Sequence, residues 1–158
     1  MGEERLRRDS GTYALLLRAD TAQTIAVGAL GTMSLRPGRY VYVGSAFGPG
    51  GVRARVQRHA RNDGARHWHV DFLRAVTRLA AVWYTHDSKR RECTWADELR
   101  SLPGAAVPVE GFGASDCNCP AHLVRFDAAP SVSSFRTRLR NRCAGHAPIG
   151  RAGAHDLQ

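Results

Sequence analysis

Two tyrosines, each two residues from a glycine, precede a predicted basic helix that carries an arginine and a histidine one turn apart. Tyr42 belongs to an alternating aromatic and β-branched run that is typical of a strand, and Tyr13 opens a second, apolar run that is also expected to be a strand. Arg55 and His59 fall together at the edge of the helix's apolar stripe. Because a neutral imidazole can accept a proton near physiological pH, we expect a chemically active pocket where the strands meet the helix. The alternative is a helix whose arginines form an ordinary solvated face.

A carboxylate on a later helix is the candidate ligand for a hard metal ion. The sequence predicts this helix from about Arg91 to Leu102, where Pro103 ends it. Its phase places Glu92 on the same face as Trp95 and Leu99. A carboxylate on a buried face is costly unless it is paired or holds a cation. The alternative is that Glu92 only interacts favourably with the positive end of the helix dipole.

Cysteine and histidine lie close together in the polar segment between Val107 and Phe126. Cys117, Cys119 and His122 are candidate zinc ligands, because thiolate and imidazole groups are the ligands that Zn²⁺ prefers. Cys93 is a possible fourth ligand. The competing interpretation is that these small side chains are simply packed in the interior.

The run from His67 to Asp71 has two interpretations. As an extended segment it would project His67, His69 and Asp71 on one side, where they could bind a metal or a phosphate. As the start of a helix at His69 it would bury Phe72 and leave the histidines to shape the site or touch a nucleic-acid backbone.

The charge of the chain favours a polyanionic partner. The 158 residues carry a net charge of +9, with a pI of about 10.4. Basic side chains release counterions when they bind phosphates, so nucleic acid is the expected partner. The candidate nucleic-acid-binding residues are Ser45, Arg53, Arg58, Arg61, His67 and His69, with the three arginines pointing outward from the helix.

A glycine-rich turn over residues 48–51 leads into the basic helix. Free backbone N–H groups at a helix start can bind phosphate, so the turn is a candidate phosphate site. The spacing and the missing lysine exclude a Walker loop. The alternative is a flexible turn without a ligand.

The chain is long enough for one domain, with 43% hydrophobic residues. We expect an α+β fold with a central three-stranded antiparallel sheet, flanked by helices, and an extra C-terminal strand and helix. The expected sheet strands are 13–17, 24–30 and 40–44; further strands are expected at 79–84 and 123–126, and a last helix capped by Ser131. We expect residues 1–10 to be a disordered arm, 11–142 the domain, and 143–158 a disordered tail.

Taken in order, these residues resemble the GIY-YIG nuclease family. Gly11-Thr12-Tyr13 would be the first motif and Tyr42-Val43-Gly44 the second. The resemblance covers about residues 11–127 and looks closest to a small prokaryotic branch sometimes joined to endonuclease III. That branch is suggested by residues 40–46, 67–71, 115–119 and 122–123. Thr12 stands in place of the usual aliphatic residue, and residues 20–38 in place of a short hairpin.

The resemblance implies a metal-dependent endonuclease. Glu92 would hold one Mg²⁺ or Mn²⁺ ion at the scissile phosphate, and Arg55 would clamp that phosphate. Tyr13 would act as the base or orient the attacking water, and Tyr42 would line the site. His59 could accept a proton from a tyrosine or from water. Because the ordinary pKa of tyrosine is near 10, we expect Arg55 and the metal to lower the pKa of Tyr13.

The expected partner is DNA, with single-stranded or structured DNA in repair as the favoured forms and RNA as the open alternative. A different class of function is a non-catalytic nucleic-acid-binding module of a repair complex. The sequence shows neither a membrane span nor a signal segment, so we expect no membrane partner and a cytoplasmic location. The oligomeric state does not follow from the sequence.

Overall fold

A five-stranded antiparallel sheet forms the centre of the molecule. The computed structural model of the chain describes residues 5–62 and 64–157. The strands follow the spatial order β6-β4-β1-β5-β7. They span Gly11–Ala19 (β1), Gly38–Ala46 (β4), Arg78–Thr85 (β5), Leu123–Phe126 (β6) and Ile149–Gly153 (β7). The four helices span Gly51–Arg61 (α1), His69–Arg74 (α2), Glu92–Arg100 (α3) and Val132–Arg142 (α4). The α+β class is confirmed, with a sheet of five strands where three were expected.

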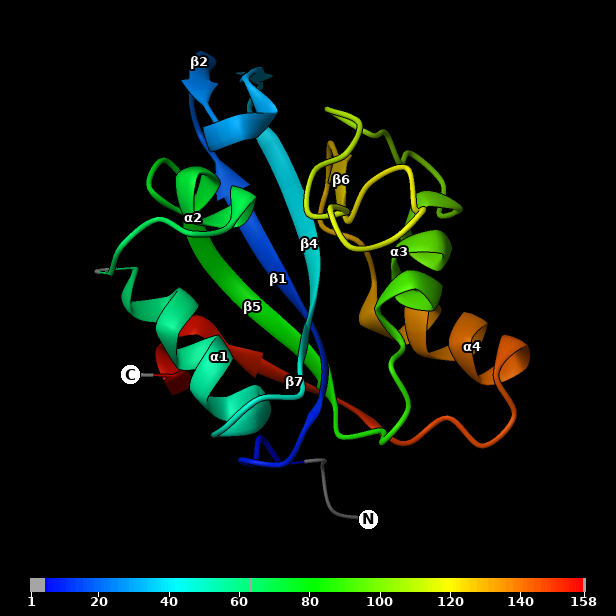
Figure 1. The fold of residues 1–158 in the computed structure, drawn as a ribbon. Coiled ribbons are helices and arrows are strands. Elements are labelled where there is room, and N and C mark those ends of the chain that lie inside the picture. The colour runs from blue at the N-terminus through cyan, green and yellow to red at the C-terminus, as the bar shows by residue number, and fades with distance from the viewer. Residues whose placement is uncertain (1–4, 63, 158) are drawn as a thin grey trace.

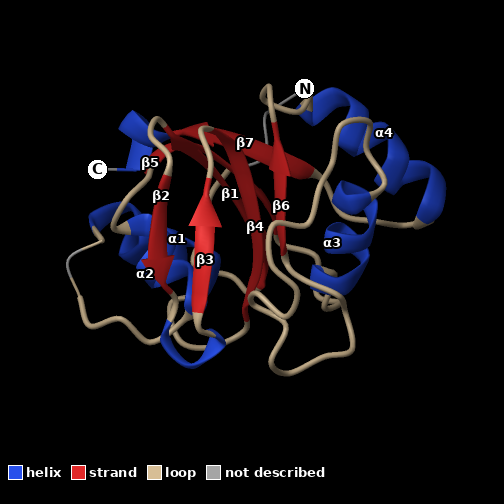
Figure 2. Ribbon diagram, turned by 90° about the horizontal axis from the view of Figure 1, so that it is seen from above, coloured by secondary structure: helices blue, strands red, loops and turns tan. Residues whose placement is uncertain are grey.

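The sheet separates two hydrophobic cores. Helices α1 and α2 cover one face, and α3 and α4 cover the other (Figures 1 and 2). Along β1, Tyr13, Leu15 and Leu17 point into the first core, whereas Ala14 and Leu16 point into the second. Both faces of this strand are buried because successive side chains alternate between the faces of a sheet. Tyr13 therefore belongs to the α1 side.

The expected strand at residues 24–30 does not join the main sheet. Residues Gln23–Ala26 (β2) instead pair with Thr32–Leu35 (β3) in a separate two-stranded sheet. A short 3-10 helix, Gly28–Leu30 (η1), connects them, and Gly28 has a positive φ of 51° that ends the strand. The place beside β1 is taken by β5, which lies inside the sheet between β1 and β7.

The expected disordered tail is ordered over most of its length. Residues 149–153 form β7, which pairs with β5, and Ala154–Leu157 form the 3-10 helix η2 packed near α1. At the other end of the chain, residues 1–4 of the expected arm lie outside the described residues. Residues 5–10 contain no helix or strand, although Leu6 packs against the core. The domain therefore extends beyond residue 142.

The last two predicted elements before the tail are confirmed. Strand β6 spans the expected residues, and the Ser131 hydroxyl accepts a hydrogen bond from Ser134 N at 3.2 Å to cap α4. Phe135 and Leu139 of α4 are fully buried. None of the helices in the described ranges is long and apolar enough to cross a membrane.

The edge of β4 changes neighbours at Tyr42. Strand β6 pairs only with residues 39–42 of β4. Immediately beyond, Val43 N donates to His122 O at 2.9 Å, where the preceding loop joins β6. This change gives the loop and the first turn of α3 access to the end of β4 that carries Gly44 and Ser45.

Candidate active site

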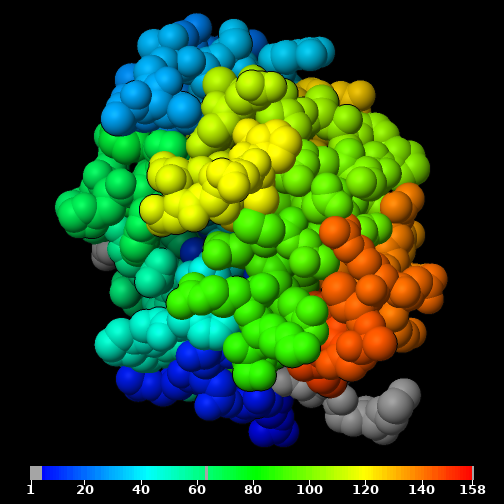
Figure 3. All heavy atoms as spheres, turned by 45° about the vertical axis from the view of Figure 1, so that its right-hand side comes forward, coloured from blue at the N-terminus to red at the C-terminus, as the bar shows by residue number. Residues whose placement is uncertain are grey.

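One cleft collects side chains from parts of the chain that are far apart in sequence. The cleft measures about 210 Å³, and a hollow is visible below the yellow loop, with blue and cyan atoms of the first strands at its base (Figure 3). Four of the five expected catalytic side chains line it: Tyr13 on β1, Tyr42 on β4, Arg55 on α1 and Glu92 on α3. The fifth, His59, lies directly behind Tyr13. The structure therefore brings all five together.

A hydrogen bond joins Tyr13 and His59. The Tyr13 hydroxyl lies 2.8 Å from His59 Nε2, and the His59 residue is only 2% exposed. Burial lowers the pKa of His59 to about 3, helped by the nearby arginines and opposed by Asp71. The imidazole is therefore neutral at physiological pH and can accept the phenol hydrogen at Nε2. Its Nδ1 has no hydrogen-bond partner among the described residues.

Both tyrosines are harder to ionise than free tyrosine. Burial, then the neighbouring Tyr42, raises the pKa of Tyr13 well above its ordinary value, and Arg55 opposes this shift without overcoming it. Burial, followed by the Glu92 charge, raises the pKa of Tyr42. We expected Arg55 to lower the pKa of Tyr13. Arg55 does act in that direction, but the pKa is raised because desolvation of the phenolate is the larger effect among the groups of the chain.

A stacked group of cations and one indole forms the rim of the cleft. The guanidinium carbons of Arg55 and Arg58 lie 4.4 and 4.3 Å from the centre of the Trp68 ring. Trp68 is 36% exposed, which is unusual for a large apolar side chain. Such cation–π contacts keep the two guanidinium groups at the cleft entrance.

Arg58 has a different environment from the one expected. Its two terminal nitrogens donate to the two oxygens of Asp71 at 3.0 and 3.2 Å, instead of pointing into water. The Asp71 carboxylate also accepts the backbone N–H groups of His67 and Trp68 at 2.7 and 2.9 Å. Burial raises the pKa of the Asp71 carboxyl group, but the Arg58 guanidinium and the two backbone N–H donors lower it below its usual value. This pair fixes the turn that carries Trp68.

The segment around His69 is helical, so the extended interpretation is wrong. Asp71 is occupied by Arg58 and the backbone, and no ligand group of His67, His69 and Asp71 is formed. Both histidines nevertheless line the cleft, as does Ser45. His69 Nδ1 accepts a hydrogen bond from Gly113 N at 2.9 Å, which ties α2 to the loop on the opposite wall. Burial lowers the pKa of His69.

The start of α1 has no free donors for a phosphate. Gly51 N donates to Gly48 O, Val52 N to Asp9 O and Arg53 N to Arg7 O, at 3.0–3.1 Å. The candidate phosphate site at the glycine-rich turn is therefore already filled by the chain's own carbonyls. Arg53 and Arg61 are exposed on α1, in agreement with their expected outward direction.

Two carboxylates line the cleft, of which only Glu92 was expected. Glu92 is partly buried in the first turn of α3, and Asp116 is exposed on the loop before β6. Hard oxygen ligands with free lone pairs suit Mg²⁺ or Mn²⁺, which are commonly held by one or two carboxylates together with water and substrate phosphates. The donor set of the cleft therefore fits such an ion.

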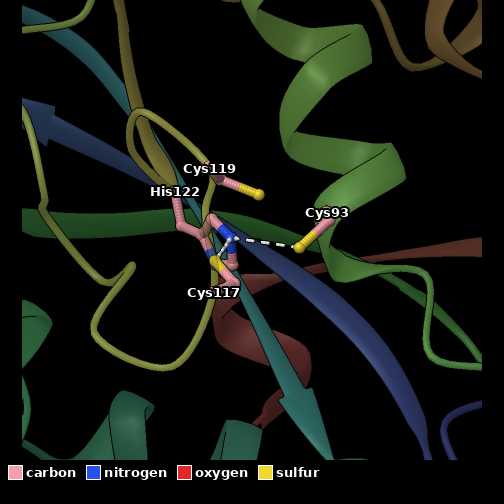
Figure 4. A group of neighbouring side chains, drawn as sticks. All are labelled: Cys93, Cys117, Cys119 and His122. Atoms are coloured by element: carbon pink, nitrogen blue, oxygen red, sulfur yellow. Dashed lines mark hydrogen bonds between the residues drawn. The ribbon is translucent and has the colours of Figure 1, made fainter.

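Beside this cleft lies a second cluster that could hold a metal ion. Cys93, Cys117, Cys119 and His122 offer ligand atoms that all lie within 4.8 Å of one another. The Sγ atoms of Cys117 and Cys93 lie 3.3 and 3.8 Å from His122 Nε2 (Figure 4). Burial, then hydrogen bonds with Cys119 and Cys117, raises the pKa of Cys93 to about 12. Burial also lowers the pKa of His122. His122 belongs to both the cluster and the cleft lining.

Several cleft residues were missed by the sequence analysis. Trp68, Asp116 and Gly113 had no predicted function. Gly113 has a φ of +70°, and a Cβ there would approach the Tyr42 ring to 2.8 Å. A tryptophan between two histidines in a basic run was a usable sequence signal for Trp68. Nothing local in the sequence marks Asp116, because the path of a loop decides where its side chain lies.

A comparison with known protein families adds one finding. The family described as "Domain of unknown function DUF123" matches residues 12–144. The chain belongs to the DUF123 family. The match covers β1, β4, all four helices and the four cluster residues, so the cleft and the cluster lie within the DUF123 region. Neither curated proteins nor solved structures gave a match to the chain.

Proposed function

We propose that this DUF123 chain is a metal-dependent endonuclease that hydrolyses phosphodiester bonds in DNA. The observation that carries the proposal is the convergence of Tyr13, Tyr42, Arg55, His59 and Glu92 in one cleft. They come from two strands and two helices and match, residue by residue, the set implied by the GIY-YIG resemblance. A binding surface alone has no need of a partly buried carboxylate beside groups that bind phosphate.

Glu92 would hold a Mg²⁺ or Mn²⁺ ion, with Asp116 near enough to the same cleft to assist. When bound, the ion supplies positive charge for the scissile phosphate and the leaving oxygen. Arg55 binds a non-bridging phosphate oxygen from the opposite wall, where its stacking on Trp68 limits the positions of the guanidinium group.

Tyr13 orients the attacking water in this proposal. The Tyr13 hydroxyl donates a hydrogen bond to neutral His59, so the lone pairs of the phenol oxygen can accept a hydrogen bond from a water in the cleft. Because burial raises the pKa of Tyr13, the phenol is protonated before the reaction. As the water attacks, its proton would pass to the Tyr13 oxygen while the phenol proton passes to neutral His59 at Nε2. Tyr42 forms the floor beside Glu92 and, being neutral, adds no negative charge against the phosphate.

The rim of the cleft favours unpaired DNA. Nucleobases stack on aromatic rings and on guanidinium planes, and the entrance offers both, because the partly exposed Trp68 lies between the stacked Arg55 and Arg58 groups. Exposed Arg53 and Arg61 on α1 continue the positive surface for the backbone. Single-stranded or flap DNA supplies unpaired bases for Trp68, whereas duplex DNA does not.

The second cluster suits zinc. Three thiols and one imidazole make a Cys₃His set, and four protein ligands leave no open position for a substrate or water. We therefore infer a structural Zn²⁺ ion there, distinct from the hard ion at Glu92.

A cleavage assay tests the nuclease proposal. End-labelled single-stranded, duplex and flap DNA are incubated with the protein in Mg²⁺, Mn²⁺ or EDTA. We expect products only with a divalent ion, and a loss of about 100-fold or more in Glu92→Gln, which keeps the shape of the side chain. Glu110→Gln is the matched control, because Glu110 is exposed and does not line the cleft.

The raised pKa values of both tyrosines, together with the low pKa of His59, favour one second candidate function. Tyr13 and Tyr42 stay protonated and the pKa of His59 makes it a weak base, which suits a module that binds nucleic acid without cutting it. Salt-sensitive DNA binding that is unchanged by EDTA, with no products under any metal, would establish this candidate and reject the nuclease.

A further inference from the structure

The first turn of α3 connects the two candidate metal positions. Glu92 lines the cleft, and Cys93, the next residue, belongs to the cysteine and histidine cluster. Successive helix residues point about 100° apart, so one turn can serve both positions at once. Figure 4 shows Cys93 extending from the start of this helix towards His122.

The start of this turn is held mainly through Arg91. This N-cap residue makes no side-chain capping bond. Its guanidinium group pairs with the Asp87 carboxylate at 3.2 Å, and its backbone N–H donates to the Thr12 hydroxyl on β1 at 3.2 Å. These contacts anchor the turn on the β1 side, and Cys93 is the residue that faces the loop on the opposite side.

The other cluster residues belong to a loop that is firmly attached to the sheet. His122 N donates to Phe112 O at 2.7 Å, and Val43 N donates to His122 O at 2.9 Å. Cys117 and Cys119 precede His122 in the same loop, whose residues Gly113, Ser115 and Asp116 form a wall of the cleft. A bond between Cys93 and this loop therefore joins α3 to β4.

The distances suit a tetrahedral ion. Zinc bonds of about 2.3 Å to sulfur and 2.0–2.1 Å to nitrogen place neighbouring ligand atoms roughly 3.5–3.8 Å apart. The Cys117 and Cys93 sulfurs lie 3.3 and 3.8 Å from His122 Nε2, and all four ligand atoms lie within 4.8 Å of one another. Only small side-chain movements are needed to reach the bonding geometry.

We propose that Zn²⁺ bound by Cys93, Cys117, Cys119 and His122 clamps the first turn of α3 to the cleft loop and thereby positions Glu92. Glu92 is fixed from two sides, by the Thr12 bond to Arg91 and by the zinc bond to Cys93. Cys93 and its partners are positioning residues, since they act on the hard-metal ligand only through the helix backbone. The consequence for Glu92 rests on the proposed nuclease function, whereas the clamp itself does not.

The test compares Cys119→Ser with Cys143→Ser. Cys143 is the one cysteine that lies outside the cluster, at the end of α4. Each protein is purified with zinc supplied and no chelator. Zinc content is then measured by mass spectrometry, backbone hydrogen exchange by peptide, and Mn²⁺ binding by electron paramagnetic resonance without DNA.

We expect about one zinc per chain in the native protein and in Cys143→Ser, and a loss of zinc in Cys119→Ser. In the zinc-free variant, hydrogen exchange should increase in residues 91–96 and 113–122 and stay unchanged in β1 and in residues 39–42 of β4, which pair with β6. Mn²⁺ affinity should fall about 10- to 100-fold, the usual effect of removing a group that orients a metal ligand. If Cys119→Ser fails to fold, native protein stripped of zinc by a mercurial reagent gives the same comparison.

Native protein that binds no zinc would overturn the clamp. Zinc loss that leaves exchange in residues 91–96 and Mn²⁺ affinity unchanged would overturn the positioning of Glu92. If zinc loss loosens both segments and no protein binds Mn²⁺, the clamp stands and the proposed ion at Glu92 is rejected. The failure of the clamp and the failure of the nuclease proposal are therefore distinguishable.

Discussion

Tyr13 and Gly44 lie opposite each other in the β1–β4 pair, and the tyrosine hydroxyl occupies the space of the side chain that Gly44 lacks. A Cβ built on Gly44 would lie 2.5 Å from the hydroxyl oxygen. The glycine of the second sequence motif therefore makes room for the tyrosine of the first. The hydroxyl is also the group that contacts His59.

Gly44→Ala should displace the Tyr13 ring from His59. Because Tyr13 is fully buried, the added methyl group overpacks the site, and we expect about 1–3 kcal/mol less stability together with at least 10-fold slower DNA cleavage. Urea unfolding and the cleavage assay measure both effects. Gly48→Ala is the control, since a Cβ at Gly48 meets nothing within 4 Å. Equal behaviour of the two variants would contradict this account of Gly44.

Removal of Arg55 should slow DNA cleavage, whereas removal of Arg53 should weaken only DNA binding. Arg55→Ala removes the phosphate-binding guanidinium from the cleft, so we expect a loss of about 100-fold or more in the cleavage rate. Arg55→Lys should recover little, because an ammonium group does not keep the planar stacking on Trp68. Arg53→Ala, on the exposed face, should weaken binding only and reduce the salt dependence of the binding constant by about one ion. Identical defects in Arg53→Ala and Arg55→Ala would argue against a specific function for Arg55.

Trp68 should report binding of single-stranded DNA by fluorescence. The chain has three tryptophans, of which Trp83 and Trp95 are at most 1% exposed, so only Trp68 can stack on a base. We expect quenching by single-stranded oligonucleotides and little by blunt duplex. Trp68→Leu should abolish the quenching and weaken single-strand binding by roughly 1–3 kcal/mol. Quenching that survives in Trp68→Leu would place the contact elsewhere.

Stability should fall with acid because of His59. Its folded pKa of about 3 is below the ordinary 6.5, so the unfolded chain binds more protons between these pH values. The contribution of neutral His59 is complete above pH 6.5 and declines by up to about 1.4 kcal/mol per pH unit as the pH drops towards 3. Urea unfolding from pH 7.5 to 4.5 should show a shallower decline in His59→Gln. His69 and His122, whose pKa values are also lowered, contribute to the remaining slope, and carboxyl groups with lowered pKa values such as Asp71 and Asp87 add to it at the acid end. Parallel curves for the two proteins would refute the assignment to His59.

Local patterns were sufficient to predict the elements that carry the site. Helical phase placed Arg55 beside His59, and the apolar runs located β1, β4, β5 and β6. They failed where pairing is decided at long range. The residues of β7 are Ile-Gly-Arg-Ala-Gly, which have little intrinsic strand preference, and they become a strand because β5 offers an open edge.

The environment of each site residue was harder to predict than its place. Sequence reasoning gave Tyr13 a lowered pKa because it counted the nearby arginine and could not measure burial, which dominates. Helical phase predicted a solvent-exposed Arg58 side chain, because nothing in the sequence shows that α2 brings Asp71 within hydrogen-bonding distance of Arg58. Cys93 was recognised as a possible fourth ligand, but only the path of the loop before β6 brings it to His122.

The pairing of β7 with β5 also affects how the protein is made. Residues 149–153 leave the ribosome after the other four strands of the sheet. One edge of β5 therefore stays unpaired while the rest of the sheet assembles. An open strand edge is a template for pairing with another chain. Slow translation of residues 149–153, or a chain truncated after α4, would therefore promote aggregation of a domain whose cleft residues are already complete.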